Sequence, residues 1–106
     1  MTFDLTGEQR IIQTMVRQFS RDVVAANATE RDQTKEFPAE VLKEMGALGL
    51  LGMMIPFEYS GSGADAVSYA LALVEIAYSC ASTAVVMSVQ NSIICESIYR
   101  FGTEEQ

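Results

Sequence analysis

The chain has 106 residues, a length that suits one domain with a single modest core. It carries seven Lys and Arg against fourteen Asp and Glu, for a formal net charge of −7. This balance argues against binding to nucleic acid or to an anionic membrane, because basic residues must supply that attraction. The chain has no His, so the commonest metal ligand is missing and no metal site is expected.

The first predicted helix begins after Thr6. Thr6 and Gln9 have the spacing of a capping box, in which each side chain binds an unpaired amide of the other residue. Apolar residues then recur at steps of three and four, which predicts one face turned to a core. They are Ile12, Met15, Val16, Phe19 and Val23. We expect the helix to end near Ala26 or Asn27.

A second, short helix is predicted after a polar connection at residues 29–37. Pro38 suits its first turn, and Gly49 is expected to end it. Its apolar stripe consists of Val41, Leu42, Met45 and Leu48. Residues 50–56 are apolar, which favours a buried connector or a short strand-like run across the end of the bundle.

Residues 57–63 contain Gly61 and Gly63 and are predicted to form a turn. Glycines can expose backbone amides to a phosphate, so a phosphate-binding loop is the alternative. No Lys follows the glycines and no strong strand precedes them. A structural turn is therefore the preferred interpretation.

The third predicted helix starts at a cap formed by Ser62 with Asp65 and runs to Cys80 or Ala81. Two apolar stripes predict packing on more than one side. They are Val67, Leu71, Val74 and Tyr78 on one side, and Ala66, Ala70, Leu73 and Ala77 on the other. The hydroxyl groups of residues 82–83 are expected to break the helix and start a fourth one, with Gly102 as a left-handed stop.

Between residues 66 and 95 the only charged side chain is Glu75. Burial would raise its pKa and make it a candidate general base, but a structural carboxylate is the preferred interpretation. Residues 76–95 are long enough to cross a bilayer, yet their recurring Ser, Thr, Asn and Gln argue against a membrane span. Cys80 and Cys95 lie in these apolar helices and are expected to be reduced structural thiols.

Several segments, in order and spacing, resemble the N-terminal helical domain of acyl-CoA dehydrogenases, and most of all the short-chain, butyryl-type branch. They are LGL (48–50), PFEYSGSG (56–63), VSY (67–69), EIAYSCAS (75–82), SVQNS (88–92) and FGTEEQ (101–106). The resemblance spans nearly the whole chain. It implies an all-α fold, a bundle of four main helices with a short irregular connector, forming one domain over residues 1–106.

In that family the complete enzyme binds FAD and oxidises an acyl-CoA to the 2,3-enoyl-CoA. The resemblance therefore implies a short or branched acyl-CoA substrate, electron-transfer flavoprotein as acceptor, and a homo-oligomer. The family's catalytic base and flavin contacts come from a middle β domain and a C-terminal helical domain beyond this segment. No catalytic or cofactor-binding residue is therefore expected in this chain.

The resemblance also assigns a candidate substrate-binding role to the fourth helix, which in the family lines the far end of the acyl pocket. By position, the wall residues are Val85, Val86, Val89 and Ile93. The alternative is that they belong to the core.

Related acyl-CoA oxidases, flavin monooxygenases and a non-catalytic helical binding module remain alternatives for the function of the whole protein. The N-terminus shows no signal or transit peptide, so a bacterial cytoplasm is expected, or the mitochondrial matrix for a mature form.

Overall fold

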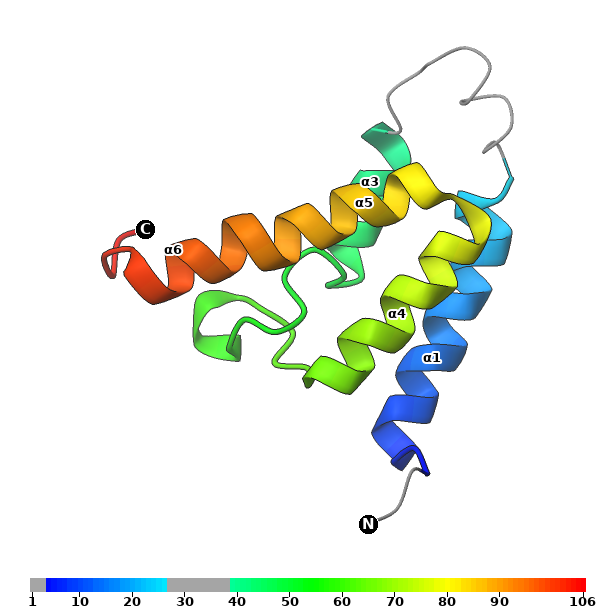
Figure 1. Ribbon diagram of the computed structural model, residues 1–106, viewed down its shortest axis with the longest axis horizontal. Coiled ribbons are helices and arrows are strands. Elements are labelled where there is room, and N and C mark those ends of the chain that lie inside the picture. The colour runs from blue at the N-terminus through cyan, green and yellow to red at the C-terminus, as the bar shows by residue number, and fades with distance from the viewer. Residues whose placement is uncertain (1–3, 27–38) are drawn as a thin grey trace.

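The computed structural model describes residues 4–26 and 39–106, and these residues contain helices and turns but no strand (Figure 1). The elements in chain order are α1 (Gly7–Phe19), the π-helical turn η1 (Ser20–Val24), α3 (Ala39–Ala47), the 3-10 turn η2 (Phe57–Tyr59), α4 (Ala66–Ser79), α5 (Ala81–Val89), the π-helical turn η3 (Gln90–Cys95) and α6 (Glu96–Phe101). Because α5, η3 and α6 follow one another without a gap, the described chain has four main helices. The predicted all-α fold is confirmed.

Helices α1 and α4 lie side by side and run in the same direction, while the α5–η3–α6 helix leads back across the molecule (Figure 1). The irregular connector between α3 and α4 lies along that last helix. One cluster of buried apolar side chains joins these elements. It consists of Val16, Phe19, Val24, Val41, Met45, Leu50, Met53, Ala72, Ile76, Ala84 and Met87.

The start of α1 has the capping box that its sequence predicts. Thr6 Oγ1 accepts from the backbone N of Gln9 at 3.2 Å, and Gln9 Oε1 accepts from the backbone N of Thr6 at 2.9 Å. Two residues of the predicted apolar stripe, Val16 and Phe19, are buried in the core. Met15, also predicted to face the core, has 38% of its surface exposed. Helical structure continues through η1 to a turn at residues 25–26, close to the predicted end.

Helix α3 ends at Ala47, and Gly49 forms the stop that the sequence predicts. Gly49 has φ +81°, and Leu50 N donates to Met45 O at 2.9 Å while Gly49 N donates to Gly46 O at 3.1 Å. These are the two hydrogen bonds of a Schellman motif, which uses a left-handed residue to satisfy the last carbonyls of a helix. The predicted polar connection at residues 29–37 and the predicted helical start at Pro38 lie outside the described residues.

The connector at residues 50–56 is buried at Leu50 and Met53, as expected of a buried connector, but it forms turns rather than a strand-like run. Residues 57–63 form the predicted turn. The predicted cap of α4 was wrong in its residue: Asp65 Oδ1 accepts from Ser68 N at 2.7 Å, whereas Ser62 Oγ donates to Gly49 O. Ser62 therefore ties the turn to the end of α3 instead of starting α4.

Helix α4 ends with Cys80 as its C-terminal cap, in agreement with the predicted end at Cys80 or Ala81, but the hydroxyl groups of residues 82–83 do not make the break. Cys80 is extended, with φ −159° and ψ 107°, and no side chain caps α5. Thr83 is buried and donates from Oγ1 to Cys80 Sγ at 3.2 Å, so its hydroxyl is turned back toward the break. The last helix ends with Gly102 as its C-terminal cap, as predicted, but Gly102 is extended, with φ −81° and ψ 168°, and not left-handed.

The most buried face of α4 contains two small side chains and lies outside both predicted apolar stripes, although Leu73 of the second stripe packs partly buried against the core. Ser68, Ala72 and Ile76 are buried, while Val74 and Tyr78 are 65% and 84% exposed. The small side chains at residues 68 and 72 let α1 approach this face closely.

The expected packing on more than one side is confirmed, because α4 contacts both α1 and α5, and its Tyr69 and Leu73 side chains pack partly buried against the core. Over residues 4–26 and 39–106, no helix combines the length and apolarity that crossing a membrane requires.

Candidate functional site

The four predicted wall residues lie along one continuous stretch of helix, α5 into η3. Val85, Val89 and Ile93 are 61%, 38% and 62% exposed, and Val86 is half-buried at their side. Three of the four thus lie outside the core of the described chain. They form a row of branched apolar side chains at steps of four residues.

The opposite face of this helix holds the connector through Asn91, which is only 3% exposed. Its Oδ1 accepts from Met53 N at 2.8 Å, and its Nδ2 donates to Leu50 O and to Met87 O, both at 2.9 Å. Cys95 adds a contact one turn on, donating from Sγ to Leu51 O at 3.4 Å. Side chains of η3 therefore satisfy backbone groups of the connector that would otherwise be buried without partners.

Two neighbouring side chains of the π-helical turn η3 bind back onto carbonyls of the preceding helical turn. Asn91 Nδ2 donates to Met87 O, and Ser92 Oγ donates to Ser88 O at 2.6 Å. In an α-helix these two carbonyls would accept from the backbone amides of residues 91 and 92. Side-chain donors that bind the carbonyl four residues earlier compete with this ladder and distort it.

Sequence analysis missed Asn91. A usable signal was present: Asn91 follows Met87 by four residues in a stretch without charges, and so shares the face of a buried apolar side chain. A polar side chain on such a face requires partners. The identity of those partners, 38 to 41 residues away in sequence, comes only from the tertiary structure.

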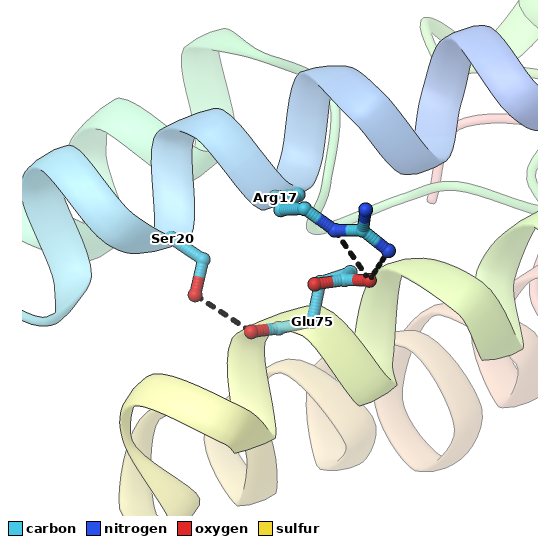
Figure 2. A network of polar contacts seen from close by, with 3 residues as sticks. All are labelled: Arg17, Ser20 and Glu75. Atoms are coloured by element: carbon cyan, nitrogen blue, oxygen red, sulfur yellow. Dashed lines mark hydrogen bonds and ion pairs between the residues drawn. The ribbon is translucent and has the colours of Figure 1, made fainter.

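Glu75 joins α4 to α1 (Figure 2). Its Oε1 accepts from Arg17 Nη2 at 2.9 Å and from Arg17 Nε at 3.2 Å, and this bond and the negative charge raise the pKa of Arg17. Beside the ion pair, Ser20 Oγ donates to Glu75 O at 2.6 Å and lies 2.6 Å from Ser79 Oγ. The carboxylate is engaged in a helix contact, which supports the structural interpretation over the general base.

The glycine-containing turn offers no free cradle of amides to a phosphate. The backbone amides of residues 60–63 donate to carbonyls of Phe57, Pro56, Gly52 and Ile55 respectively, at 2.9 to 3.1 Å. An anion would have to displace these bonds. The geometry therefore favours the structural turn.

A cavity of about 220 Å³ lies between this turn and α6. Tyr59 donates to both carboxylate oxygens of Glu104 at 3.0 and 3.2 Å, which raises the pKa of Tyr59, and its ring meets Tyr99 edge-on. None of the predicted wall residues lines the cavity. The cavity is smaller than the roughly 300 to 1,000 Å³ of typical ligand sites, so it does not fit a dinucleotide such as FAD.

In the described chain no group of acidic, Cys or His side chains is placed to hold a metal ion.

Comparison with known proteins gives one consistent result. Residues 6–106 match the family described as "Acyl-CoA dehydrogenase, N-terminal domain". The chain is 45% identical over all 106 residues to "Probable acyl-CoA dehydrogenase YngJ" of Bacillus subtilis (strain 168), of which it spans 28%.

Two solved structures are similar over 99% of the chain and match 28% of their own length. Butyryl-CoA dehydrogenase from Megasphaera elsdenii superposes with a TM-score of 0.91 at 33% identity. A chain described under "Electron transferring flavoprotein of Acidaminococcus fermentans: Towards a mechanism of flavin-based electron bifurcation" superposes with a TM-score of 0.94 at 35% identity.

Proposed function

Because the chain belongs to the acyl-CoA dehydrogenase N-terminal domain family, we propose that the whole protein is an FAD-dependent acyl-CoA dehydrogenase. It oxidises a short or branched acyl-CoA to the 2,3-enoyl-CoA. The observation that carries the proposal is the match to acyl-CoA dehydrogenases over the full 106 residues. The structural similarity to a butyryl-CoA dehydrogenase supports the short-chain substrate.

This domain contributes the wall of the acyl pocket. Val85, Val89 and Ile93 form the exposed row on α5 and η3, and Val86 lies beside them. Branched side chains fill space that additional methylenes would otherwise occupy, and one methylene in an apolar pocket is worth about 1–3 kcal/mol. A row of them therefore limits the length of the acyl chain.

The reacting groups lie in other parts of the protein. FAD, when bound, accepts the hydride, and the cavity of about 220 Å³ beside α6 is too small to hold it. The Glu75 carboxylate is bound to Arg17 and is not placed as a base. The role of this chain is to shape the site and to exclude substrates that are too long.

The exposed apolar side chains of α4 support association with further protein. Val67, Val74 and Tyr78 are 48%, 65% and 84% exposed, and apolar groups gathered on one helix mark interaction surfaces. We expect a homo-oligomer, with electron-transfer flavoprotein as the redox partner. The expected location is a bacterial cytoplasm, or the mitochondrial matrix for a mature form.

The test uses the full-length protein, titrated without oxygen with butyryl-CoA and with octanoyl-CoA while the flavin absorbance is followed. The expected result is bleaching by butyryl-CoA in preference to octanoyl-CoA. Rapid reoxidation of the bleached flavin by oxygen would identify an oxidase instead. A protein that binds no flavin, or a flavin that neither acyl-CoA bleaches, would contradict the proposal.

The wall is tested by Val89→Ala and Ile93→Ala, which should shift the preference toward octanoyl-CoA. Ile11→Ala is the matched control, because Ile11 is also an exposed branched side chain, at 70%, but lies on α1. An unchanged preference in both wall variants would remove these residues from the pocket.

A further inference from the structure

On the α5–η3 helix, residues spaced by four stay aligned along the helix axis, both on the face that binds the connector and on the exposed face. In an α-helix, residues spaced by four drift around the axis, because one turn takes about 3.6 residues. A π-turn, with hydrogen bonds from residue i to i+5, rotates less per residue, so a spacing of four stays nearly in line. Through η3, Asn91 and Cys95 accordingly both bind the connector, while Val89 and Ile93 both remain exposed on the outer side.

Asn91 links these two faces. Its amide donates to Met87 O within the helix, where it competes with the α-helical ladder, and it binds both Leu50 and Met53 of the connector. Without this side chain, the additional donor at Met87 O and both bonds to the connector are lost. The turn can then relax toward an α-helix, and Ile93 rotates out of line with Val89.

We propose that Asn91 is a positioning residue for the acyl-pocket wall: by holding η3 against the connector, it fixes the places of Val89 and Ile93 that limit acyl-chain length. The inference rests on the proposed function. Asn91 lies on the buried face of the helix, away from the exposed row, so it acts through the backbone and not by contact with the acyl chain.

The experiment uses the full-length protein with bound flavin and measures kcat/KM for butyryl-CoA and octanoyl-CoA. Asn91→Leu keeps the approximate volume and removes all three hydrogen bonds. The ratio of kcat/KM for octanoyl-CoA over butyryl-CoA should rise about tenfold, the size of effect that one methylene's worth of space produces. Asn91→Asp keeps an acceptor for Met53 N but removes both donations at neutral pH, and should shift the ratio in the same direction.

The control is Val16→Ala, which leaves a void at a fully buried site on α1, a helix outside the connector and η3. If the position of the wall residues limits acyl-chain length, Val16→Ala should lower the stability of the protein without changing the ratio of kcat/KM for the two substrates. A changed ratio would mean that general loosening of the core is sufficient. An unshifted ratio in whichever Asn91 variants fold with flavin overturns the inference, as does an equal shift in Val16→Ala. If both Asn91 variants fail to bind flavin while Val16→Ala binds it, the residue is structural and the inference is also overturned.

Failure of the proposed function gives a different result. In that case the unaltered protein oxidises neither acyl-CoA. An unaltered protein that is active, with variants whose ratio is unchanged, refutes only the role of Asn91.

Discussion

Gly49 and Ser62 allow a quantitative test of how the connector is fixed to α3. At Gly49 the backbone has φ +81°, and an added Cβ would collide with Ser62 Oγ, the group that donates to Gly49 O at 2.7 Å. Gly49→Ala therefore has two costs. The left-handed conformation costs about 1–2 kcal/mol, and loss of the displaced Ser62 hydrogen bond costs roughly 1 kcal/mol.

The expected loss for Gly49→Ala is thus about 2–3 kcal/mol. In a Ser62→Ala background the colliding hydroxyl is absent, and Gly49→Ala should cost only the strain of about 1–2 kcal/mol. The two substitutions should therefore be coupled by roughly 1 kcal/mol. Hydrogen exchange of the Leu50 amide, which donates to Met45 O, measures the local opening free energy in all four proteins.

Additive effects of the two substitutions would refute the assigned contact. A cost below about 0.5 kcal/mol for Gly49→Ala would refute the strained conformation itself.

Three further predictions concern α4. The hydrogen bonds from Ser68 and Gln9 lower the pKa of Asp65 below its ordinary 3.8, so the stability that the Asp65 carboxylate contributes is present above pH 3.8 and is lost as the pH falls through the folded pKa. The unfolding midpoint of Asp65→Asn should therefore lack this dependence at acid pH, and identical pH profiles for the variant and the unaltered protein would contradict the prediction. Glu75→Gln should weaken the contact of α1 with α4 and leave kcat of the full-length enzyme within a few-fold of the unaltered value. A loss of kcat by several orders of magnitude would instead identify Glu75 as the general base. Ile76→Ala, at a fully buried site, should cost about 2–5 kcal/mol in denaturant unfolding, and Val74→Ala, 65% exposed, less than about 0.5 kcal/mol; similar losses at both sites would contradict the assigned face.

Features governed by neighbouring residues could be predicted from the sequence. The capping box of Thr6 with Gln9 and the stop at Gly49 each depend on contacts within a few residues, and both were confirmed. The all-α fold followed from the resemblance and from helical periodicity. Short-range chemistry therefore fixed where α1 begins and where α3 ends.

Features that depend on tertiary contacts could not be predicted in the same way. The third helix ends where it was predicted to end, at Cys80, but the expected cap is not made, because the Thr83 hydroxyl is buried and binds Cys80 Sγ. Ser62 does not cap α4 as expected, because its hydroxyl donates to the carbonyl of Gly49, thirteen residues earlier in the sequence.

The outer faces of α4 illustrate a limit of apolarity as a guide. Hydrophobic periodicity selected Val67 and Val74, but the face that packs on α1 contains Ser68 and Ala72. Close approach of two helices depends on small side chains, which hydrophobicity alone ranks low. For the wall residues, the resemblance supplied the candidates, and periodicity by itself could not separate a pocket wall from a core.

The central claim is that α5 and η3 form the end wall of an acyl-CoA pocket. The most direct measurement is a crystal structure of the full-length protein with bound FAD and a non-reactive butyryl-CoA analogue. We expect the terminal carbons of the acyl chain to lie within about 4–4.5 Å of the side chain of Val89 or Ile93. An acyl chain that ends against another element, with this row of side chains covered by protein and remote from the ligand, would contradict it.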